Sequence, residues 1–286
     1  MFEWEAKAEG EANGFTCAAA VGETLVAGAY GAILTSADGE RWARARIPEG
    51  VGWLRGAFAS EDGFACVVGD GGTLLVSQDG AATFESHGTD RNRLEGVARR
   101  GDQVWVVGAA GTILHSGDRG RSWSPQRNGS GQHLSGIVLA PNGTLYVSGT
   151  GGTVLRSVDG QTWTIARQKG SAFLYGIASL GGALVAPAGN GSVYVSHDDG
   201  GTWKAARTRT KGYFYGGAAA SGREVWVAGS SAERQYLLLS SEDGKVWHPH
   251  ALPESGYQLD RVFARSDDEI WVAGGERMFR GIRVSE

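Results

Sequence analysis

A short motif recurs six times along the chain at nearly constant spacing, and this repeat restricts the fold more than any other feature. Each copy begins at a serine, continues through an aspartate and usually a glycine, and ends at an aromatic residue, as in "SGDRGRSW" at Ser116–Trp123. Copies start at Ser36, Ser77, Ser116, Ser157, Ser196 and Ser241. The period is about 40 residues, which is the length of a four-stranded unit in a closed ring of sheets.

A second marker supports a count of seven units. A short apolar run that ends in glycine precedes each motif, as in "VVGDGG" and "VVGAAG", and a seventh such run, "VAGGER", follows the last motif. Seven units of about 40 residues nearly fill the 286 residues of the chain. The sequence therefore predicts an all-β, seven-bladed β-propeller with four-stranded blades, built as a single domain over residues 1–286.

The last unit ends before a fourth strand could form. Residues 2–8 resemble the outer strands of other units, such as "RWARARI". We therefore expect the N-terminal strand to complete blade seven and close the ring, which removes the open sheet edges. We also expect a monomer.

The recurring motif favours a structural role over a catalytic one. Its serine and aspartate oxygens can accept hydrogen bonds from N–H groups of their own turn, its glycine allows a positive φ, and its aromatic ring can be buried between blades. A catalytic centre would occur once rather than six times. His115, which varies between units, is expected to face solvent. The residues assigned to this motif are Ser36, Asp38, Trp42, Ser77, Asp79, Phe84, Ser116, Asp118, Trp123, Ser157, Asp159, Trp163, Ser196, Asp198, Trp203, Ser241, Asp243 and Trp247.

The pattern S-x-D-x-G-x-[ST]-W is the Asp-box, or BNR repeat. Stretches such as "VGAAGTILHSGDRGRSW" and "SGTGGTVLRSVDGQTW" resemble the photosystem II stability and assembly factor family, over nearly the whole chain. The resemblance implies a seven-bladed ring with a non-enzymatic assembly role, exercised by docking onto a membrane-protein subunit.

Function is expected where the first, innermost strand of each unit begins. An apolar anchor recurs there (Phe15, Leu54, Leu94, Leu134, Leu174, Phe214 and Leu259), while the residues on either side of it vary. A ring of such positions around the channel could form one asymmetric site for a protein partner or a small anionic or glycan ligand. The residues predicted to bind are Trp53, Arg55, Arg93, His133, Phe173, Tyr175, Tyr213, Tyr215 and Asp260.

A glycoside-cleaving or glycan-binding propeller is the alternative. Glu95 and Asp260 would then act as the carboxyl pair that glycosidases use, helped by Tyr175, Tyr215 and Arg55. The two carboxyls come from units three and seven, so the sequence leaves their separation open.

Two groups of loop residues leave a functional and a neutral interpretation equally open. Cations in the inter-unit loops could steer an anionic partner, or simply be solvated. The longer second turn of unit six, Gly229 to Tyr236, could add binding specificity, or it could be a neutral insertion in a loop that tolerates changes in its sequence. The loop cations are Arg91, Arg93, Arg127, Arg167, Lys169, Arg207, Arg209 and Lys211.

Composition excludes several classes. The net charge of -4 argues against nucleic-acid binding, and no apolar run approaches the roughly 20 residues of a membrane-spanning helix. No zinc cluster, phosphate-binding loop, dinucleotide fingerprint or calcium loop is found, so we expect no cofactor and no metal. The N-terminus has no apolar leader, which predicts a cytoplasmic protein, or an exported one if a leader has been removed. Cys17 and Cys66 lie in apolar runs and are expected to be buried free thiols.

Overall fold

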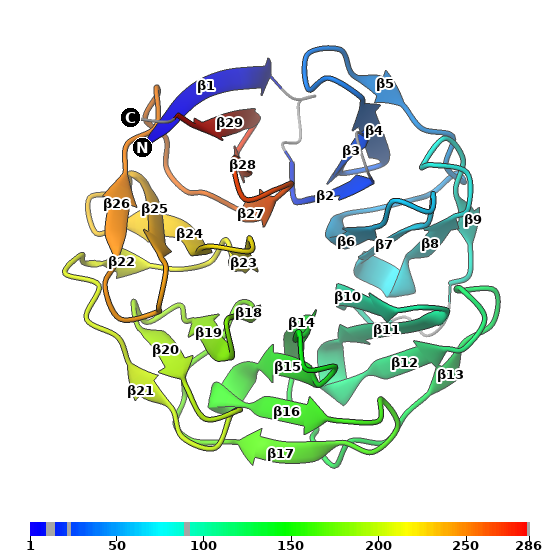
Figure 1. Ribbon diagram of the computed structural model, residues 1–286. Helices are drawn as coiled ribbons and strands as arrows, with labels where there is room; N and C mark the ends of the chain where they lie inside the picture. The colour runs from blue at the N-terminus through cyan, green and yellow to red at the C-terminus, as the bar shows by residue number, and fades with distance from the viewer. Residues whose placement is uncertain (10–14, 22–23, 89–91, 285–286) are drawn as a thin grey trace.

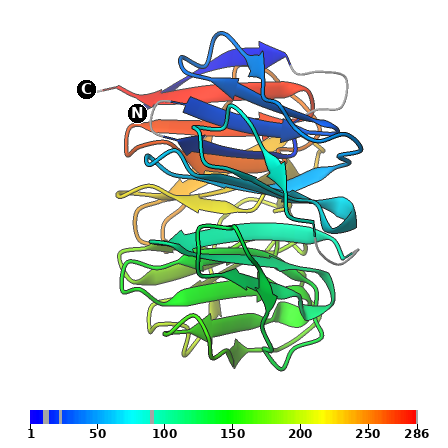
Figure 2. The ribbon, with the colours of Figure 1, turned by 90° about the vertical axis from the view of Figure 1, so that its right-hand side faces the viewer.

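Seven antiparallel sheets surround a central axis in the computed structural model, which describes residues 1–9, 15–21, 24–88 and 92–284 (Figure 1). The predicted seven-bladed β-propeller is confirmed. Figure 2 shows the ring from its side, with the N-terminal and C-terminal strands lying together. In the described part of the chain, no helix has the length and apolar character needed to cross a membrane.

Each blade runs outward from the channel in chain order. Blade one consists of β2 (Cys17–Val21), β3 (Thr24–Ala29), β4 (Ala32–Ser36) and β5 (Ala43–Arg44). Blade two consists of β6 (Leu54–Ala59), β7 (Ala65–Gly69), β8 (Leu74–Ser77) and β9 (Glu85–Ser86). Blade three consists of β10 (Leu94–Arg100), β11 (Gln103–Gly108), β12 (Ile113–Ser116) and β13 (Ser124–Pro125). Blade four consists of β14 (Leu134–Leu139), β15 (Leu145–Gly149), β16 (Val154–Ser157) and β17 (Thr164–Arg167). Blade five consists of β18 (Ala178–Leu180), β19 (Ala183–Pro187), β20 (Val193–Ser196) and β21 (Lys204–Ala205).

Blade six departs from the four-strand pattern because its inner strand is divided. It contains β22 (Gly212–Tyr213), β23 (Ala218–Ala220), β24 (Val225–Ser231), β25 (Tyr236–Ser241) and β26 (His248–His250), and both β22 and β23 pair with β24. The interruption contains Gly216 and Gly217. A Cβ on Gly216 would lie 2.5 Å from the carbonyl oxygen of Leu259, so the inner strand passes too close to blade seven for a larger residue.

The N-terminal strand closes the ring, as predicted. Blade seven consists of β27 (Arg261–Ala264), β28 (Glu269–Gly274) and β29 (Arg277–Arg283), and β1 (Phe2–Glu9) pairs antiparallel with β29. Phe2 is buried, and its ring meets Trp226 of blade six edge-on at 5.0 Å between centroids. Closure therefore rests on packing between blades as well as on the hydrogen bonds of the sheet.

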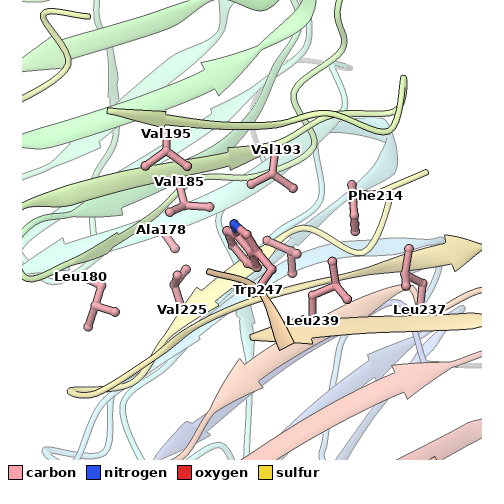
Figure 3. Packing of buried hydrophobic residues seen from close by; sticks show 11 residues of the cluster. Ala178, Leu180, Val185, Val193, Val195, Phe214, Val225, Leu237, Leu239 and Trp247 are labelled. Atoms are coloured by element: carbon pink, nitrogen blue, oxygen red, sulfur yellow. The ribbon is translucent and has the colours of Figure 1, made fainter. Parts of the chain in front are cut away.

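The apolar core lies between neighbouring blades rather than at one centre. Figure 3 shows the interface of blades five and six, where Trp247 is surrounded by Val185, Val195 and Leu239. The seven predicted anchors are buried, each with at most 1% of its surface exposed. Cys17 and Cys66 are buried free thiols, as expected.

The Asp-box turns connect the third strand of a blade to the fourth. In the third blade, the N–H of Gly120 donates to Ser116 Oγ at 2.7 Å, and the N–H of Ser122 donates to Asp118 Oδ1 at 2.9 Å. Hydrogen bonds from Ser122 hold the pKa of Asp118 well below its usual range. These local bonds form the turn without any ligand, and equivalent serine and aspartate bonds occur in the other five copies.

His115 is half-buried, so the expectation that it faces solvent was wrong. Its ring lies 5.3 Å from that of Trp105 on the neighbouring strand, and its Nε2 is 2.5 Å from Gln103 Oε1. Burial lowers the pKa of His115. It belongs to the packing of the blade.

Candidate functional site

Antiparallel pairing gives the ring two distinct faces. The inner strands begin at one face, which we call the channel-mouth face, and the turns from second to third strand return to it. The Asp-box turns lie at the other face, which we call the box face. Residues that precede or begin the inner strands therefore share the channel-mouth face.

A β-bulge presents a variable residue to the channel in three consecutive blades. Leu54 pairs with Gly69 and Gly56 with Val68, so Arg55 between them is left out of the ladder. The same irregularity falls at Glu95 and at Ser135. A bulge bends its strand and redirects a side chain, which explains why these residues line the channel while their anchors stay buried.

The glycine that ends the second strand holds the residue before the anchor in place. A Cβ on Gly69 would lie 2.2 Å from the carbonyl oxygen of Trp53, and the N–H of Asp70 donates to that oxygen at 2.8 Å. The corresponding glycine and N–H hold Arg93 in blade three. The glycine marker is thus a requirement for close approach of two backbones in blades two, three, four, six and seven.

A cavity of about 420 Å³ lies at the channel mouth. Eight of the predicted residues line it, namely Arg55, Arg93, Glu95, His133, Phe173, Tyr175, Tyr215 and Asp260. Trp53 and Tyr213 are not among its lining residues and are exposed by 37% and 46%. The structure therefore brings most of the predicted set together and places two members outside the cavity.

Four further residues line the cavity. Thr16, Ser135 and Gln258 flank an anchor, so they belong to the predicted ring of positions although they were not among the residues predicted to bind. The fourth, Arg261, lies outside that ring. Arg261 could have been found from the repeat. It stands two residues after the anchor, where five other units have glycine: Gly56, Gly96, Gly136, Gly176 and Gly216. Its guanidinium donates to the carbonyl of Arg55 at 2.6 Å and to that of Asp260 at 2.8 Å.

The charged part of the cavity comes from blades seven, two and three. Arg55 makes two 2.9 Å hydrogen bonds to Asp70, and this carboxylate raises the pKa of Arg55. Arg93 Nε lies 2.6 Å from Glu95 Oε1, and His133 Nε2 lies 3.2 Å from the same oxygen. Asp70, which sequence reasoning missed, is adjacent to the glycine marker of its own unit.

The aromatic part comes mainly from blades five and six. Phe173 stacks on Tyr175 with 4.2 Å between ring centroids, and Tyr175 meets Tyr215 edge-on at 5.0 Å. His133 lies 5.5 Å from Phe173 and continues the row into blade four. Burial raises the pKa of both tyrosines, so both are neutral at physiological pH.

Exposed aromatic rings flank the cavity on two sides. Trp53 meets Tyr30 at 5.3 Å where blades one and two adjoin. Tyr213 stacks on Tyr215 at 5.9 Å in blade six, and Tyr257 precedes blade seven with 62% of its surface exposed. These four residues, Tyr30, Trp53, Tyr213 and Tyr257, are called the rim aromatics below.

The loop cations do not form one uniform group. Arg167 turns inward, with its guanidinium 4.6 Å from the ring centre of Tyr194, so it is part of the blade packing. The side chains of Arg127, Lys169, Arg207, Arg209 and Lys211 are exposed. Arg91 lies outside the described residues. The longer turn of blade six extends the β24–β25 hairpin, and Tyr236 at its end donates from its hydroxyl to the carbonyl of Gly274 at 3.1 Å.

Both candidate carboxylates already have polar partners. Glu95 lies between Arg93 and His133, whereas Asp260 accepts from the side chain of Gln258 at 2.8 Å and from the N–H of Gly275 at 3.1 Å. The cavity therefore offers fixed charges and aromatic surfaces for binding.

Comparison with known proteins confirms the resemblance seen in the repeats. A family model described as photosynthesis system II assembly factor YCF48 matches residues 34–136, and a DUF6242 beta propeller domain model matches residues 91–214. No curated relative matches the sequence at a significant level.

Solved structures share the ring over nearly its whole length. YCF48 bound to a D1 peptide has 15% identity and a TM-score of 0.76, with 98% of this chain and 97% of that chain covered. YCF48 from Cyanidioschyzon merolae has 15% identity and a TM-score of 0.74, with 98% of each chain covered. A virginiamycin B lyase from Staphylococcus aureus has 12% identity and a TM-score of 0.82, with 99% and 100% covered. At these identities the likeness shows the fold.

Proposed function

We propose that the channel-mouth face binds a segment of a partner protein, and that the chain is a non-enzymatic docking module. The rim aromatics are the observation that carries this proposal, because large exposed rings stand on two sides of one cavity. Tyrosine, tryptophan and arginine are enriched among residues that dominate the energy of protein interfaces. A segment crossing the mouth would contact both groups of rings.

Charge and resemblance support the same conclusion. Exposed cations in the loops before blades four, five and six would attract a segment with acidic residues and raise its rate of association. YCF48, whose family model matches part of this chain, has been solved bound to a D1 peptide. We therefore propose an acidic, extended protein segment as the ligand.

Site-specific photo-crosslinking tests which face is used. A photoreactive phenylalanine analogue is placed at Tyr213 or Trp53 on the channel-mouth face, and at Val158 or Val246 on the box face. Both valines are 59% exposed, so they are matched controls. We expect one source-cell protein to be crosslinked from the channel-mouth positions only. Crosslinking from the box face, or equally from both faces, would contradict the proposal.

Affinity measured with that purified partner gives the second readout. Trp53→Ala combined with Tyr213→Ala should weaken binding at least ten-fold, because each lost ring removes about 1–2 kcal/mol or more of binding free energy. Val158→Ala should leave the affinity unchanged. Equal affinities for all three proteins would exclude the rim aromatics as the binding surface.

A glycan-binding or glycoside-cleaving propeller is the second candidate, and one observation favours it. Glu95 and Asp260 line the same cavity as Tyr175 and Tyr215, so carboxylates and aromatic stacking surfaces are combined. Hydrolysis of fluorogenic glycosides that disappears in Glu95→Gln and Asp260→Asn, with folding intact, would establish it. Retained partner binding in those two variants would favour the docking module.

A further inference from the structure

The cavity at the channel mouth differs chemically from one side to the other. In blade order, blades five and six contribute Phe173, Tyr175 and Tyr215, whereas blades seven, two and three contribute Arg261, Arg55 and Arg93. Its volume of about 420 Å³ lies within the range of small-molecule sites, roughly 300–1,000 Å³. A ligand that fills it would therefore contact rings on one side and guanidinium groups on the other.

Arg261 differs from the other two arginines in its partners. Arg55 is paired with Asp70 and Arg93 with Glu95. The hydrogen bonds of Arg261 go to two main-chain carbonyls, and no carboxylate lies within ion-pair distance of it among the residues that the structure describes. Its positive charge is therefore available to an incoming anion, and a guanidinium matches a carboxylate in geometry.

The repeat makes the position of Arg261 unusual. Glycine stands there in five blades, and all five of these glycines border the inner channel beneath the cavity, which has a volume of about 230 Å³. Arg261 borders both the cavity and this inner channel. Its side chain thus stands where five other blades have none, between the cavity and the inner channel, beside Arg55, Glu95, Ser135 and Tyr175, which border both spaces too.

The aromatic wall restricts the rest of the ligand. Phe173 and Tyr175 stack face to face, and Tyr215 stands edge-on to Tyr175. Such walls accept a further ring in an offset-stacked or edge-on position. Two acidic residues, Glu95 and Asp260, line the same cavity, and this disfavours a ligand with several negative charges.

We propose that this cavity binds a small monoanion in which a planar aromatic ring carries a carboxylate, with the carboxylate on Arg261 and the ring against Tyr175 and Tyr215. The site goes beyond protein docking because it uses the cavity lining rather than the rim aromatics. The same chemistry could come from a free aromatic acid or from an aromatic residue at the end of a protein chain.

Calorimetric titration with matched probes tests the proposal. The probes are 4-hydroxybenzoate, its neutral analogue 4-hydroxybenzamide, the non-aromatic cyclohexanecarboxylate, and N-acetyl-glycyl-phenylalanine with a free carboxyl end. We expect 4-hydroxybenzoate to bind at least ten-fold more tightly than the amide and more tightly than cyclohexanecarboxylate. If the peptide binds more tightly than 4-hydroxybenzoate, the ligand is the end of a protein chain. If 4-hydroxybenzoate binds more tightly, the ligand is a free aromatic acid.

Variants decide whether the binding occurs at Arg261. Arg261→Gly introduces the residue that five other blades already carry, and should weaken binding of the preferred probe at least ten-fold. Tyr175→Leu is a second variant, to be used if Arg261→Gly does not fold, and it should weaken binding of the same probe several-fold. Arg121→Ala removes an exposed charge on the box face and should have no effect. No binding of any carboxylate at millimolar concentration, or equal affinity in the wild type and in Arg261→Gly, would overturn the proposal.

The outcome is separable from the docking test. Trp53→Ala removes a rim ring outside the cavity lining and should leave probe affinity unchanged while it weakens partner binding. Loss of probe binding in Arg261→Gly with crosslinking preserved would support the small-molecule site independently of the partner.

Discussion

The indole nitrogen of Trp105 donates a 2.8 Å hydrogen bond to the carbonyl of Gly160, and so ties the third blade to the Asp-box of the fourth. The contact is close, because a Cβ on Gly160 would lie 2.3 Å from the indole ring. A Cβ on Gly39 of the first box would lie 2.5 Å from the ring of Trp271 of blade seven. The box glycine at these two junctions therefore permits an aromatic ring of the preceding blade to pack against the turn.

Gly160→Ala should lower the free energy of unfolding by about 3 kcal/mol, of which about 1 kcal/mol comes from the positive φ and the rest from the clash with Trp105. Gly80→Ala is a matched control. Gly80 also follows a box aspartate and has φ of 76°, against 75° for Gly160, but has nothing within 4 Å of the added Cβ. Urea unfolding of both variants would separate strain from clash, and equal losses would mean that the Trp105 contact adds nothing.

Stability should fall between pH 6.5 and pH 4 because of His250. Its ring is packed 4.6 Å from Trp226, and burial lowers the pKa of His250 from 6.5 to about 4. The unfolded chain takes up a proton in this interval while the folded chain does not, so acidification favours unfolding. The loss attributable to this residue is roughly 3 kcal/mol.

Urea unfolding at pH 7 and at pH 4.5 gives the stability that each protein loses over this interval, and the loss of the wild type is compared with that of two variants. His250→Asn should lose less stability than the wild type over that interval, whereas the exposed neighbour variant His248→Asn should lose as much as the wild type. Identical pH profiles for all three proteins would rule out His250 as the titrating group.

Phe2 should contribute far more to stability than its place at the chain end suggests. Phe2→Ala removes a buried ring from the contact with Trp226 and should lower the free energy of unfolding by about 3–4 kcal/mol. The exposed neighbour variant Glu3→Ala should change it by less than about 0.5 kcal/mol. Thermal unfolding followed by calorimetry gives both values. A small effect of Phe2→Ala would show that ring closure does not depend on this packing.

Neither thiol should react in the native protein. Burial raises the pKa of Cys17 to about 12 and raises that of Cys66 as well, so both are protonated and inaccessible at neutral pH. Titration with a chromogenic disulfide reagent should give no reaction under native conditions and two equivalents in denaturant. Rapid native labelling of either cysteine would reveal opening of a blade interface.

The main features of the fold could be predicted from the sequence because the determining interactions are local. The serine, aspartate and glycine of each Asp-box form their bonds within one turn, as Gly120 and Ser116 do, and repetition at a constant period makes this pattern visible. The anchors were predictable for the same reason. The divided inner strand of blade six was not, because the repeat places a glycine two residues after the anchor in undivided inner strands as well, such as Gly56 in β6.

The sequence by itself therefore determined the blade count, the ring closure and the ring of positions that face the channel. Only the tertiary structure decided which of those side chains share a cavity and what partners they have. Asp70 engages Arg55 across a turn, and Arg261 reaches the carbonyl of Arg55 across the first blade. Residues 206 positions apart in the chain are adjacent there because ring closure brings blade seven back to the start, and no local pattern encodes that distance.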